Sequence, residues 1–370
     1  MATTIVRPSA APTETPGASP ARPARWRPST GGVIARAVVL AALLGGVASI
    51  PLLVPGTDVN VVSRVAVFAI IALSLNVLVG YTGQVSLGHS AFLGVGAFTA
   101  GFGLTELGMP WAASAGLAVA IGGLAAMLLG GVALRIQGLY LALVTLAYGL
   151  FAEQVLFSIP AITGGGAGMP APRPAFATGD VPYAYLCLGA LALVWIIDRR
   201  VTASKAGRAI RALRDSERVA ASWGINVTGY KLLAFVLSGS IAGLAGALFA
   251  SIEEIVSNLT FSFTLSLTFL FMAVIGGVGS RIGVVIGAAL LGSMPFVLDR
   301  LAQNNPGFPV DGSAAQLLSA LLLLLVLVFF PGGIDQLIAP VVRWCSFRPW
   351  QASGRESSAT THTGGDSGRP

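Results

Sequence analysis

The sequence predicts an all-α polytopic membrane protein with about ten transmembrane helices, some of them interrupted by glycines. The first observation is composition. Of 370 residues, 55% are hydrophobic and only 10% are charged, and the mean hydropathy is +0.81. Soluble chains carry roughly 25% charged residues, so this chain has too few charges to cover a surface that faces water. The second observation is a series of long apolar runs, which approach the roughly 20 residues needed to cross a bilayer.

The apolar segments set the expected positions of the spans. They lie at 34–54, 60–79, 86–104, 111–133, 138–158, 183–198, 231–251, 263–278, 283–300 and 313–331. The third and eighth are short or rich in glycine. Such breaks are tolerated inside a membrane where the freed backbone groups find protein or water partners.

The two ends of the chain differ from the rest. Residues 1–30 are rich in proline, alanine and threonine and hold no apolar core, so they resemble neither a span nor a signal peptide. The tail after Trp350 is also polar. We expect a disordered cytoplasmic tail at 1–30, a transmembrane domain at 31–335 and a cytoplasmic polar tail at 336–370.

The basic residues predict the orientation. With ten spans and a cytoplasmic amino terminus, only Arg64, Arg173 and Arg300 fall on the outer side, whereas the other basic residues fall inside. Because Lys and Arg collect in cytoplasmic loops, both termini are expected in the cytoplasm. The net charge of +7 therefore reflects topology, and nucleic acid is not an expected partner.

The segment 199–230 is the one part of the chain that reads as water-soluble. It contains seven of the 22 Lys and Arg residues. Arg208, Arg211 and Arg214 recur at a spacing of three, as do Ile210 and Leu213, which predicts a short helix with one basic and one apolar face. A second short stretch with small residues follows, and Gly224 is its expected stop.

Two interpretations of this basic segment stay open. It is either an anchor that anionic lipid attracts, or a pair of helices that docks on a cytoplasmic subunit through the apolar ridge of Ile210 and Leu213. Asp215 and Glu217 favour docking, because lipid binding does not need acidic residues. The sequence holds no GxxxxGK[ST] motif, so any ATP that powers this protein must bind to another chain.

Two Gly-rich stretches interrupt the apolar pattern. The first reads GYTGQVSLGHSAF from Gly80 to Phe92, and the second reads VIGGVGSRIGVVIG at 274–287. Each has two glycines three residues apart, Gly80 and Gly83 in one, Gly276 and Gly279 in the other. Transporters built from internal repeats carry such paired interruptions beside the transport path. The match is short, so an internal repeat and a chance similarity both stay open.

The first stretch also brings neutral polar side chains into the membrane. Gln84, Ser86, His89 and Ser90 supply donors and acceptors that suit a polar or zwitterionic solute. Tight helix packing is the more common use of such glycines. His89 more often serves as an interhelical hydrogen-bonding group than as a proton relay, and no chain of Asp, Glu and His crosses the membrane to support proton coupling.

Other classes of function find little support. Two histidines, two distant cysteines and no nucleophile–base set argue against an enzyme or a metal site. A channel or secondary transporter that needs no ATPase is not excluded by composition. A membrane scaffold would leave the polar interruption without a role.

Four stretches together resemble a known family. NVLVGYTGQVSLGHSAFLGVGAFTAG (Asn76–Gly101) resembles the signature of branched-chain amino acid permeases of the ABC importer superfamily, of the LivM/LivH type. The segments Leu134–Gly149, Gly207–Ala250 and Gly276–Gly292 match in the same order, and LVLVFFPGGI (Leu325–Ile334) also fits. The similarity covers about residues 60–335 and is closer to the M-type subunit.

The resemblance implies a permease domain at 31–335 in the inner (plasma) membrane of a bacterium. The expected partners are a homologous H-type permease, two ABC ATPase subunits, a periplasmic or lipid-anchored solute-binding protein and membrane lipid. The chain itself would not be an enzyme and would bind no cofactor, because ATP would bind to the partner subunits. Leucine, isoleucine and valine are the expected solutes. Urea, amides or other amino acids remain alternatives, because related permeases carry similar signatures.

The resemblance also implies site residues. Those of the translocation pathway and signature are Asn76, Gly80, Tyr81, Thr82, Gly83, Gln84, Ser86, Gly88, His89, Ser90, Gly276, Gly277 and Gly279. Those of the ATPase coupling loop are Gly207, Arg208, Arg211, Arg214, Asp215, Glu217, Ala220, Ala221 and Gly224. The chain departs from the family at Ser280 and Arg281, which make the second Gly-rich stretch unusually basic.

Overall fold

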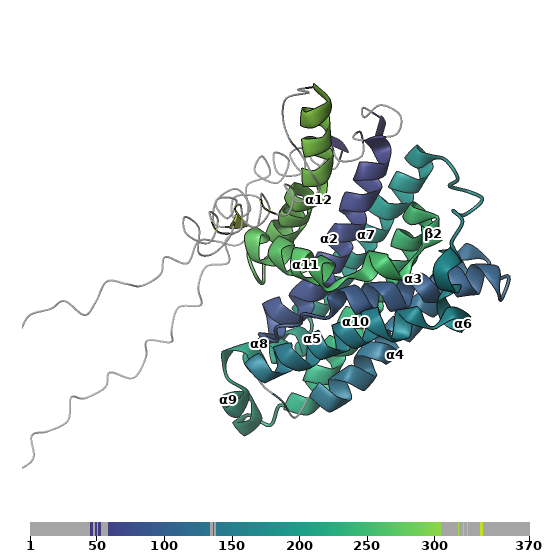
Figure 1. Cartoon of the computed structure of the whole chain (residues 1–370). Helices are drawn as coiled ribbons and strands as arrows, with labels where there is room; N and C mark the ends of the chain where they lie inside the picture. Colours follow the sequence, from purple (N-terminus) through teal and green to yellow (C-terminus); the bar gives the residue numbers. More distant parts are fainter. Residues whose placement is uncertain are drawn as a thin grey trace, which may run out of the picture.

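The computed structural model describes residues 58–133, 136 and 138–304, with isolated positions at 45–46, 49, 51–52, 317, 321, 324 and 334–335. Helices dominate this part of the chain (Figure 1). The α-helices are α2 (Val59–Asn76), α3 (His89–Thr105), α4 (Trp111–Ala133), α5 (Leu139–Gln154), α6 (Pro160–Thr163), α7 (Asp180–Ala203), α8 (Lys205–Asp215), α9 (Glu217–Ser222), α10 (Val227–Glu253), α11 (Phe263–Gly276) and α12 (Arg281–Asn304). The π-helix η2 (Val77–Thr82) continues α2, and short 3₁₀ turns lie at Leu156–Ser158, Gly165–Ala167 and Asn258–Phe261.

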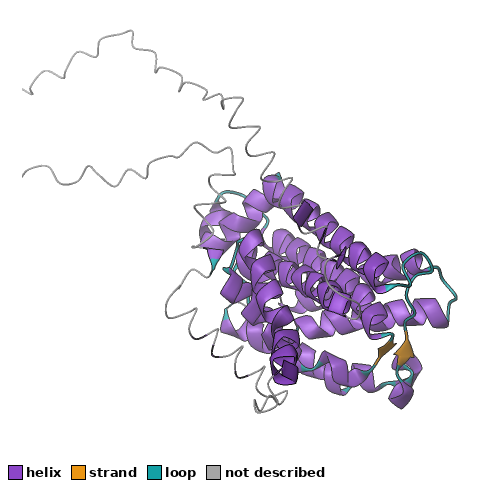
Figure 2. Ribbon diagram, turned by 90° about the horizontal axis from the view of Figure 1, so that it is seen from above, coloured by secondary structure: helices purple, strands orange, loops and turns teal. Residues whose placement is uncertain are grey.

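The long helices lie side by side in a bundle, which Figure 2 shows from above. Helix α10 packs against α2, α3 and α4, and α2 also packs against α7, α11 and α12. Two short strands, β1 (Met169–Pro170) and β2 (Ile255–Val256), pair antiparallel, with Met169 opposite Val256. They join the segment before α7 to the segment after α10. We call this the strand end of the bundle; α8 and α9 lie at the opposite end (Figure 1).

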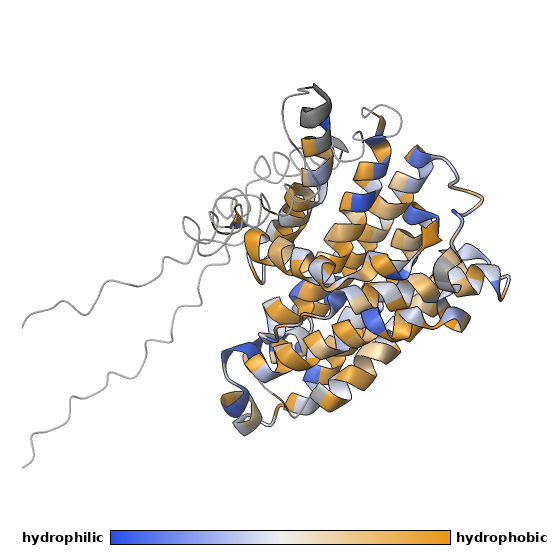
Figure 3. Cartoon of the chain, in the orientation of Figure 1, coloured by the Kyte–Doolittle hydropathy of each residue, from blue (hydrophilic) through white to orange (hydrophobic). Residues whose placement is uncertain are grey.

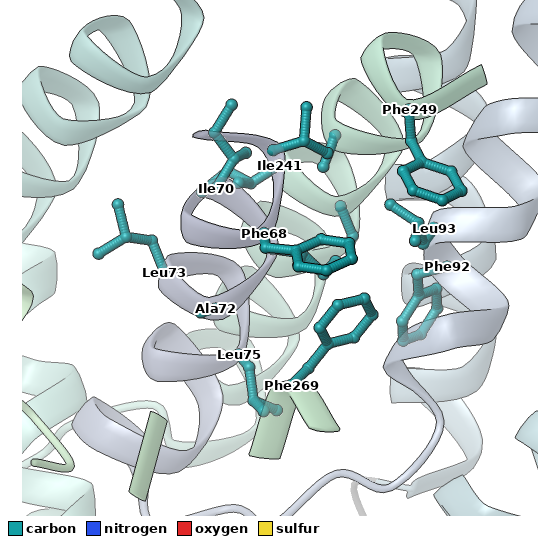
Figure 4. Packing of buried hydrophobic residues seen from close by; sticks show 14 of the residues in the cluster. Phe68, Ile70, Ala72, Leu73, Leu75, Phe92, Leu93, Ile241, Phe249 and Phe269 are labelled. Atoms are coloured by element: carbon teal, nitrogen blue, oxygen red, sulfur yellow. The ribbon is translucent and has the colours of Figure 1, made fainter. Parts of the chain in front are cut away.

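Aromatic and branched side chains fill the centre of the bundle (Figure 4). The ring of Phe68 from α2 lies 5.5 Å from that of Phe269 and 6.2 Å from that of Phe249, measured between centroids. Such aromatic contacts add to the van der Waals packing that holds helices together in a bilayer, where water no longer drives their association.

Glycines bring three of these helices into backbone contact. A Cβ atom on Gly96 of α3 would lie 2.6 Å from the Cα of Gly243 on α10. A Cβ atom on Gly122 of α4 would lie 2.6 Å from the carbonyl oxygen of Gly239, also on α10. The α3–α4–α10 core therefore depends on small residues at its crossings, as in other membrane bundles.

Six helices among the described residues are long and apolar enough to cross a membrane, so the chain is a multi-pass membrane protein. They are Val59–Thr82, Trp111–Val132, Leu139–Ser158, Asp180–Ala203, Val227–Glu253 and Arg281–Leu298. The spans expected at 86–104 and 263–278 correspond to α3, with 17 residues, and α11, with 14. Those at 34–54 and 313–331 lie largely outside the described residues, as do both tails. The structure thus supports a polytopic helical fold without establishing the count of ten.

The two ends of the bundle differ in charge. At the strand end, Arg64 pairs with Glu253 at 2.7 Å, Arg173 pairs with Asp180 at 2.7 Å, and Arg300 pairs with Asp58. The opposite end carries the basic segment of α8 and α9, whose polar residues appear blue at the lower left of Figure 3.

Candidate functional site

The two Gly-rich stretches contact each other. The first turn, Val77–Gly88, runs from η2 to the start of α3, and the second turn, Gly276–Ser280, joins α11 to α12. The amide of Gly279 donates to the side-chain oxygen of Asn76, at 2.8 Å. A Cβ atom on Gly80 would lie 2.9 Å from that same amide nitrogen. Residues about 200 positions apart in sequence are therefore in direct contact.

Glycine is needed at Gly80 because of the π-helix. A Cβ atom there would lie 2.1 Å from the side-chain oxygen of Asn76, the oxygen that holds Gly279. The π-helix ends at Gly83, whose φ of 72° lies in the left-handed region. Single turns of π-helix often occur at functional positions, because they redirect a helix without ending it.

The basic segment reaches both turns through one side chain. Nη1 of Arg214, in the last turn of α8, donates to the carbonyl of Gly80 at 2.6 Å. A Cβ atom on Gly279 would lie 3.1 Å from the same nitrogen. Arg214 therefore contacts the first turn directly and covers the glycine at the second.

The other two arginines of α8 hold the corner between α7 and α8. Arg211 donates to the carbonyl of Thr202 at 2.7 Å, and Arg208 donates to that of Ala203 at 3.4 Å. Cations at a helix C-terminus satisfy its last carbonyls and complement its dipole. Gly207 is buried at this corner, where a Cβ atom would lie 2.3 Å from the carbonyl oxygen of Val201.

The predicted amphipathic helix is confirmed as α8, but the predicted docking ridge is wrong. Ile210 and Leu213 are only 2% and 3% exposed, because they pack into the bundle of their own chain. The large exposed apolar side chains of the segment are Val219, at 56%, and Trp223, at 81%. Their spacing of four places them on one side of α9, a pattern that the sequence already contained.

Helix α9 is fixed by local contacts. Ser216 caps its start by accepting from the amide of Val219, and Gly224 ends it at a φ of 76°, as the sequence predicted. Glu217 pairs with the buried Nζ of Lys231 on α10, at 2.5 Å. Asp215 and Ala221 are exposed, whereas Ala220 is buried.

A buried carboxylate that sequence reasoning missed lies beside both turns. Asp198, near the end of α7, accepts from the hydroxyl of Tyr81 at 2.9 Å and pairs with Arg281 at the start of α12. Arg281 also donates to Thr202. The unusual charge of the second turn is therefore compensated by an acidic residue that sits at the end of a predicted span.

The carboxyl-terminal segment also contacts the second turn. The hydroxyl of Ser280 donates to Asp335 at 2.5 Å, and the amide of Ile334 donates to the carbonyl of Ile275 at 2.9 Å. Ser280 in turn caps α12 by accepting from the amide of Gly283, at 3.2 Å. Asp335 was not predicted as a site residue, and only the neighbouring motif at Leu325–Ile334 marked this region of the sequence.

The neutral polar residues of the first turn form a buried network. The ring nitrogens of His89 lie 3.0 Å from the hydroxyl of Ser86 and 3.1 Å from that of Ser238 on α10. Ser90 bonds to Ser266 of α11, with 2.7 Å between the hydroxyls. The interpretation of His89 as an interhelical hydrogen-bonding group is confirmed.

Two buried polar atoms beside the first turn take no part in this network. The side-chain amide nitrogen of Asn76 and the side-chain oxygen of Gln84 are buried, and neither has a hydrogen-bond partner among the described residues. One is a donor and the other an acceptor. Thr82, by contrast, bonds back to the carbonyl of Leu78 at 2.6 Å.

The first turn also holds α5. The amide of Leu87 donates to the hydroxyl of Thr145 at 3.0 Å, and a Cβ atom on Gly88 would lie 2.3 Å from the carbonyl oxygen of Thr145. The Cα of Gly88 in turn lies 3.2 Å from where a Cβ atom on Gly149 would be. At its other end, α5 offers Glu153, whose carboxylate accepts from the amide of Phe263 at the start of α11, at 2.9 Å.

Two cavities lie away from the turns. One of about 790 Å³ is lined by apolar side chains of α3, α4 and α5, among them Phe98, Leu128 and Tyr148. The other, of about 520 Å³, lies at the strand end beside Arg173 and Glu254. Among the residues that the structure describes, no group of His, Cys, Asp or Glu side chains could hold a metal ion.

Comparison with known proteins places this arrangement in a family. The model of the family described as branched-chain amino acid transport system / permease component matches residues 57–330. The high-affinity branched-chain amino acid transport system permease protein LivM of Salmonella typhimurium is 30% identical over 355 residues, which cover 88% of this chain and 80% of the relative. LivM of Escherichia coli is 32% identical over 289 residues, covering 70% and 68%.

More distant matches include LivH of Escherichia coli, 30% identical over 131 residues that cover 35% of this chain and 40% of the relative. No solved structure matches the chain significantly. The family match spans α2 to α12, with both Gly-rich turns and the basic segment between them. The chain therefore belongs to the family of permease components of branched-chain amino acid transport systems.

Proposed function

We propose that this chain is the M-type permease subunit of an ATP-driven importer of leucine, isoleucine and valine. The observation that carries the proposal is the contact between Arg214 of the basic segment and the carbonyl of Gly80 in the first turn. The basic segment, which can dock on an ATPase subunit, is thereby joined to the helix α2–η2 that the first turn interrupts. An ATP-independent channel has no need of such a connection.

In this account the motor is a pair of ABC ATPase subunits, and α9 is the main docking element. Val219 and Trp223 are apolar side chains on a water-facing, basic end of the molecule, where they gain most from being covered. The residues of the coupling loop then have different tasks: Arg214 contacts the first turn, Arg208 and Arg211 hold the α7–α8 corner, and α9 meets the partner. ATP binds to the partner subunits, and this chain binds no cofactor.

The solute path is placed beside the first turn. The unpartnered amide nitrogen of Asn76 and side-chain oxygen of Gln84 support this placement, because buried polar atoms normally have partners and a passing polar or zwitterionic solute could supply them. An H-type permease, similar to the LivH relatives, completes the path from the other side. A periplasmic or lipid-anchored binding protein delivers the solute and sets most of its selectivity.

The distribution of charge supports the proposed topology. We place the end with α8 and α9 in the cytoplasm, since basic residues collect on that side. The strand end, where Arg64, Arg173 and Arg300 each pair with an acidic residue, then faces outward. On the same basis we propose that both termini lie in the cytoplasm. The chain would then cross the inner (plasma) membrane with ten spans.

The test is the uptake of radiolabelled leucine into proteoliposomes that contain this chain with its candidate H-type partner, ATPases and binding protein. Uptake that requires both ATP and the binding protein is expected. Uptake by this chain alone, indifferent to ATP, would contradict the proposal in favour of a channel or carrier. If an assembled complex hydrolyses ATP but transports no leucine, the importer proposal stands. The solute would then be sought among urea, amides and other amino acids.

A further inference from the structure

A single buried carboxylate connects three elements at the α8–α9 end. Asp198 is only 2% exposed in its side chain. It accepts from the hydroxyl of Tyr81 in the first turn and pairs with Arg281 next to the second turn. Arg281 also donates to Thr202, one turn after Asp198 on α7. Both Gly-rich turns are thus attached to the last two turns of α7.

Arg281 occupies a position where a cation is normally unfavourable. It begins α12, and the N-terminus of a helix carries partial positive charge. Removing either partner of a buried ion pair leaves the other charge without compensation, so such a pair constrains its surroundings strongly. The charge of Arg281 is therefore tolerated because Asp198 compensates it. This ion pair fixes the position of the second turn relative to α7.

The end of α7 forms one body with the basic segment. Ser204 follows α7 directly and caps α8, and the carbonyls of Thr202 and Ala203 accept from Arg211 and Arg208 of α8. Asp198 near the end of α7 and Arg214 in the last turn of α8 therefore belong to two helices that are fastened together at this corner. The corner contacts the first turn at Gly80 and Tyr81, and it contacts the second turn through Arg281.

We propose that Asp198 and Arg281 are positioning residues that make the second Gly-rich turn move together with the ATPase coupling segment. This inference rests on the proposed function. It assigns the buried pair a task that Arg214 cannot perform, since Arg214 donates a hydrogen bond only to the first turn among the described contacts. Movement of the ATPase subunits is then transmitted through α7 and α8 to both Gly-rich turns at once.

The experiment compares wild type with Arg281→Gln in the assembled, purified complex. Hydrogen exchange is followed in peptides that cover the first turn and the second turn, with and without ATP. Wild type is expected to show an ATP-dependent change of exchange in both turns. In Arg281→Gln the first turn keeps its response through Arg214, whereas most of the response of the second turn is lost, because the hydrogen bond from Gly279 to Asn76 is then its main remaining connection. The leucine transported per ATP hydrolysed falls several-fold.

Two further variants control for simple loss of structure. Arg300→Gln removes another Arg–Asp pair from the same helix, at the strand end, where Asp58 is the partner, and it is expected to leave both turns responsive. The double variant Asp198→Asn with Arg281→Gln removes both charges and keeps a hydrogen-bond acceptor for Tyr81. It is expected to fold better than either single variant and still to lose the response of the second turn.

The outcomes separate this inference from the proposed function. A wild-type complex without ATP-dependent uptake would overturn the proposed function, and this inference with it. A wild-type complex that transports leucine, beside variants whose second turn responds to ATP as much as the wild type does, would overturn only this inference. A lower unfolding temperature of the variants with an unchanged ratio of leucine to ATP would also overturn it, because the pair would then serve stability alone.

Discussion

Gly88 lies where the first turn crosses α5 and leaves no room for a methyl group. A Cβ atom would meet the carbonyl oxygen of Thr145 at 2.3 Å, and that oxygen belongs to a backbone that cannot rotate away. We predict that Gly88→Ala lowers the free energy of unfolding by about 1–3 kcal/mol, as overpacking does elsewhere. The thermal midpoint of the purified protein in detergent measures this loss, and leucine uptake should fall with it.

The matched control is Gly116→Ala on α4, where no atom beyond the adjacent residues and backbone of its own helix lies within 4 Å of the added methyl group. The control should keep its thermal midpoint, since alanine favours a helix over glycine. Equal midpoints for the two variants would show that α5 moves aside without cost, and the close contact would then have no role in holding α5.

Gly83 is needed for a different reason, its backbone conformation. Its φ is 72°, whereas a Cβ atom would meet Arg214 at ordinary van der Waals distances, with its Cγ at 3.5 Å and its Cα at 4.0 Å. Asparagine visits this left-handed region more readily than a β-branched residue does. We therefore predict that Gly83→Val lowers stability by about 1–2 kcal/mol, and that Gly83→Asn lowers it by clearly less in the same thermal assay. The same loss in both variants would point to steric crowding instead.

At the scale of the helix, α9 carries the proposed contact with the motor. We predict that Trp223→Ser reduces the amount of ATPase subunit that copurifies with the permease, because the most exposed apolar side chain of the segment is removed. Membrane insertion and the thermal midpoint should not change, since this side chain contributes little to the packing of its own chain.

Leu259→Ser is the matched control for that experiment. Leu259 is also a highly exposed apolar residue, but it lies at the strand end, beyond α10. It should leave copurification of the ATPase unchanged. An equal effect of both variants, or none of Trp223→Ser, would refute the assignment of α9 as the docking element.

The sequence predicted the position and the two faces of α8, but it did not predict that the apolar face would be buried within this chain. A spacing of three between apolar residues predicts that one face of a helix is covered, but it does not say by which chain. The apolar face of Ile210 and Leu213 is covered by this chain, so the ridge open to a partner moved to Val219 and Trp223. The helix stop at Gly224 was predictable because a left-handed position there favours glycine.

The pairing of the two Gly-rich stretches was visible in the sequence, whereas their connections were not. The spacing of the glycines predicted two similar interruptions. The bonds from Asn76 to Gly279 and from Asp198 to Arg281 join residues far apart in sequence, so they depend on how whole helices pack. Asp198 looked like an ordinary residue at the end of a span, and no local pattern marks it.

At the scale of the whole molecule, the proposed topology places the two ends of the bundle on opposite sides of the membrane. With Cys345 replaced by serine and Cys187 buried, single cysteines at Leu259 and Trp223 can report the orientation. In intact cells, a maleimide that cannot cross the membrane should label Leu259→Cys, and it should label Trp223→Cys only after permeabilisation. The reverse pattern would invert the topology.

The sequence described the molecule as a membrane bundle because composition alone excludes a soluble fold. The number of spans is not established by the described residues, because two of the ten expected spans lie largely outside them. Helices α3 and α11 fall short of the length that the apolar runs suggested, because glycines at Gly88 and Gly277 delimit them and turn the chain. Span boundaries that depend on such turns follow from tertiary contacts, and hydrophobicity alone does not fix them.

The measurement that tests the central claim most directly is the ratio of leucine transported to ATP hydrolysed, followed in the same proteoliposomes for wild type and Arg214→Gln. Arg214 donates a charged hydrogen bond to Gly80, a contact worth about 1.5–3 kcal/mol. We predict that the variant keeps ATP hydrolysis but loses most of its leucine uptake, and that Arg214→Lys retains part of it. A wild-type ratio in Arg214→Gln would contradict the account, because the coupling segment would then act on the permease without this contact.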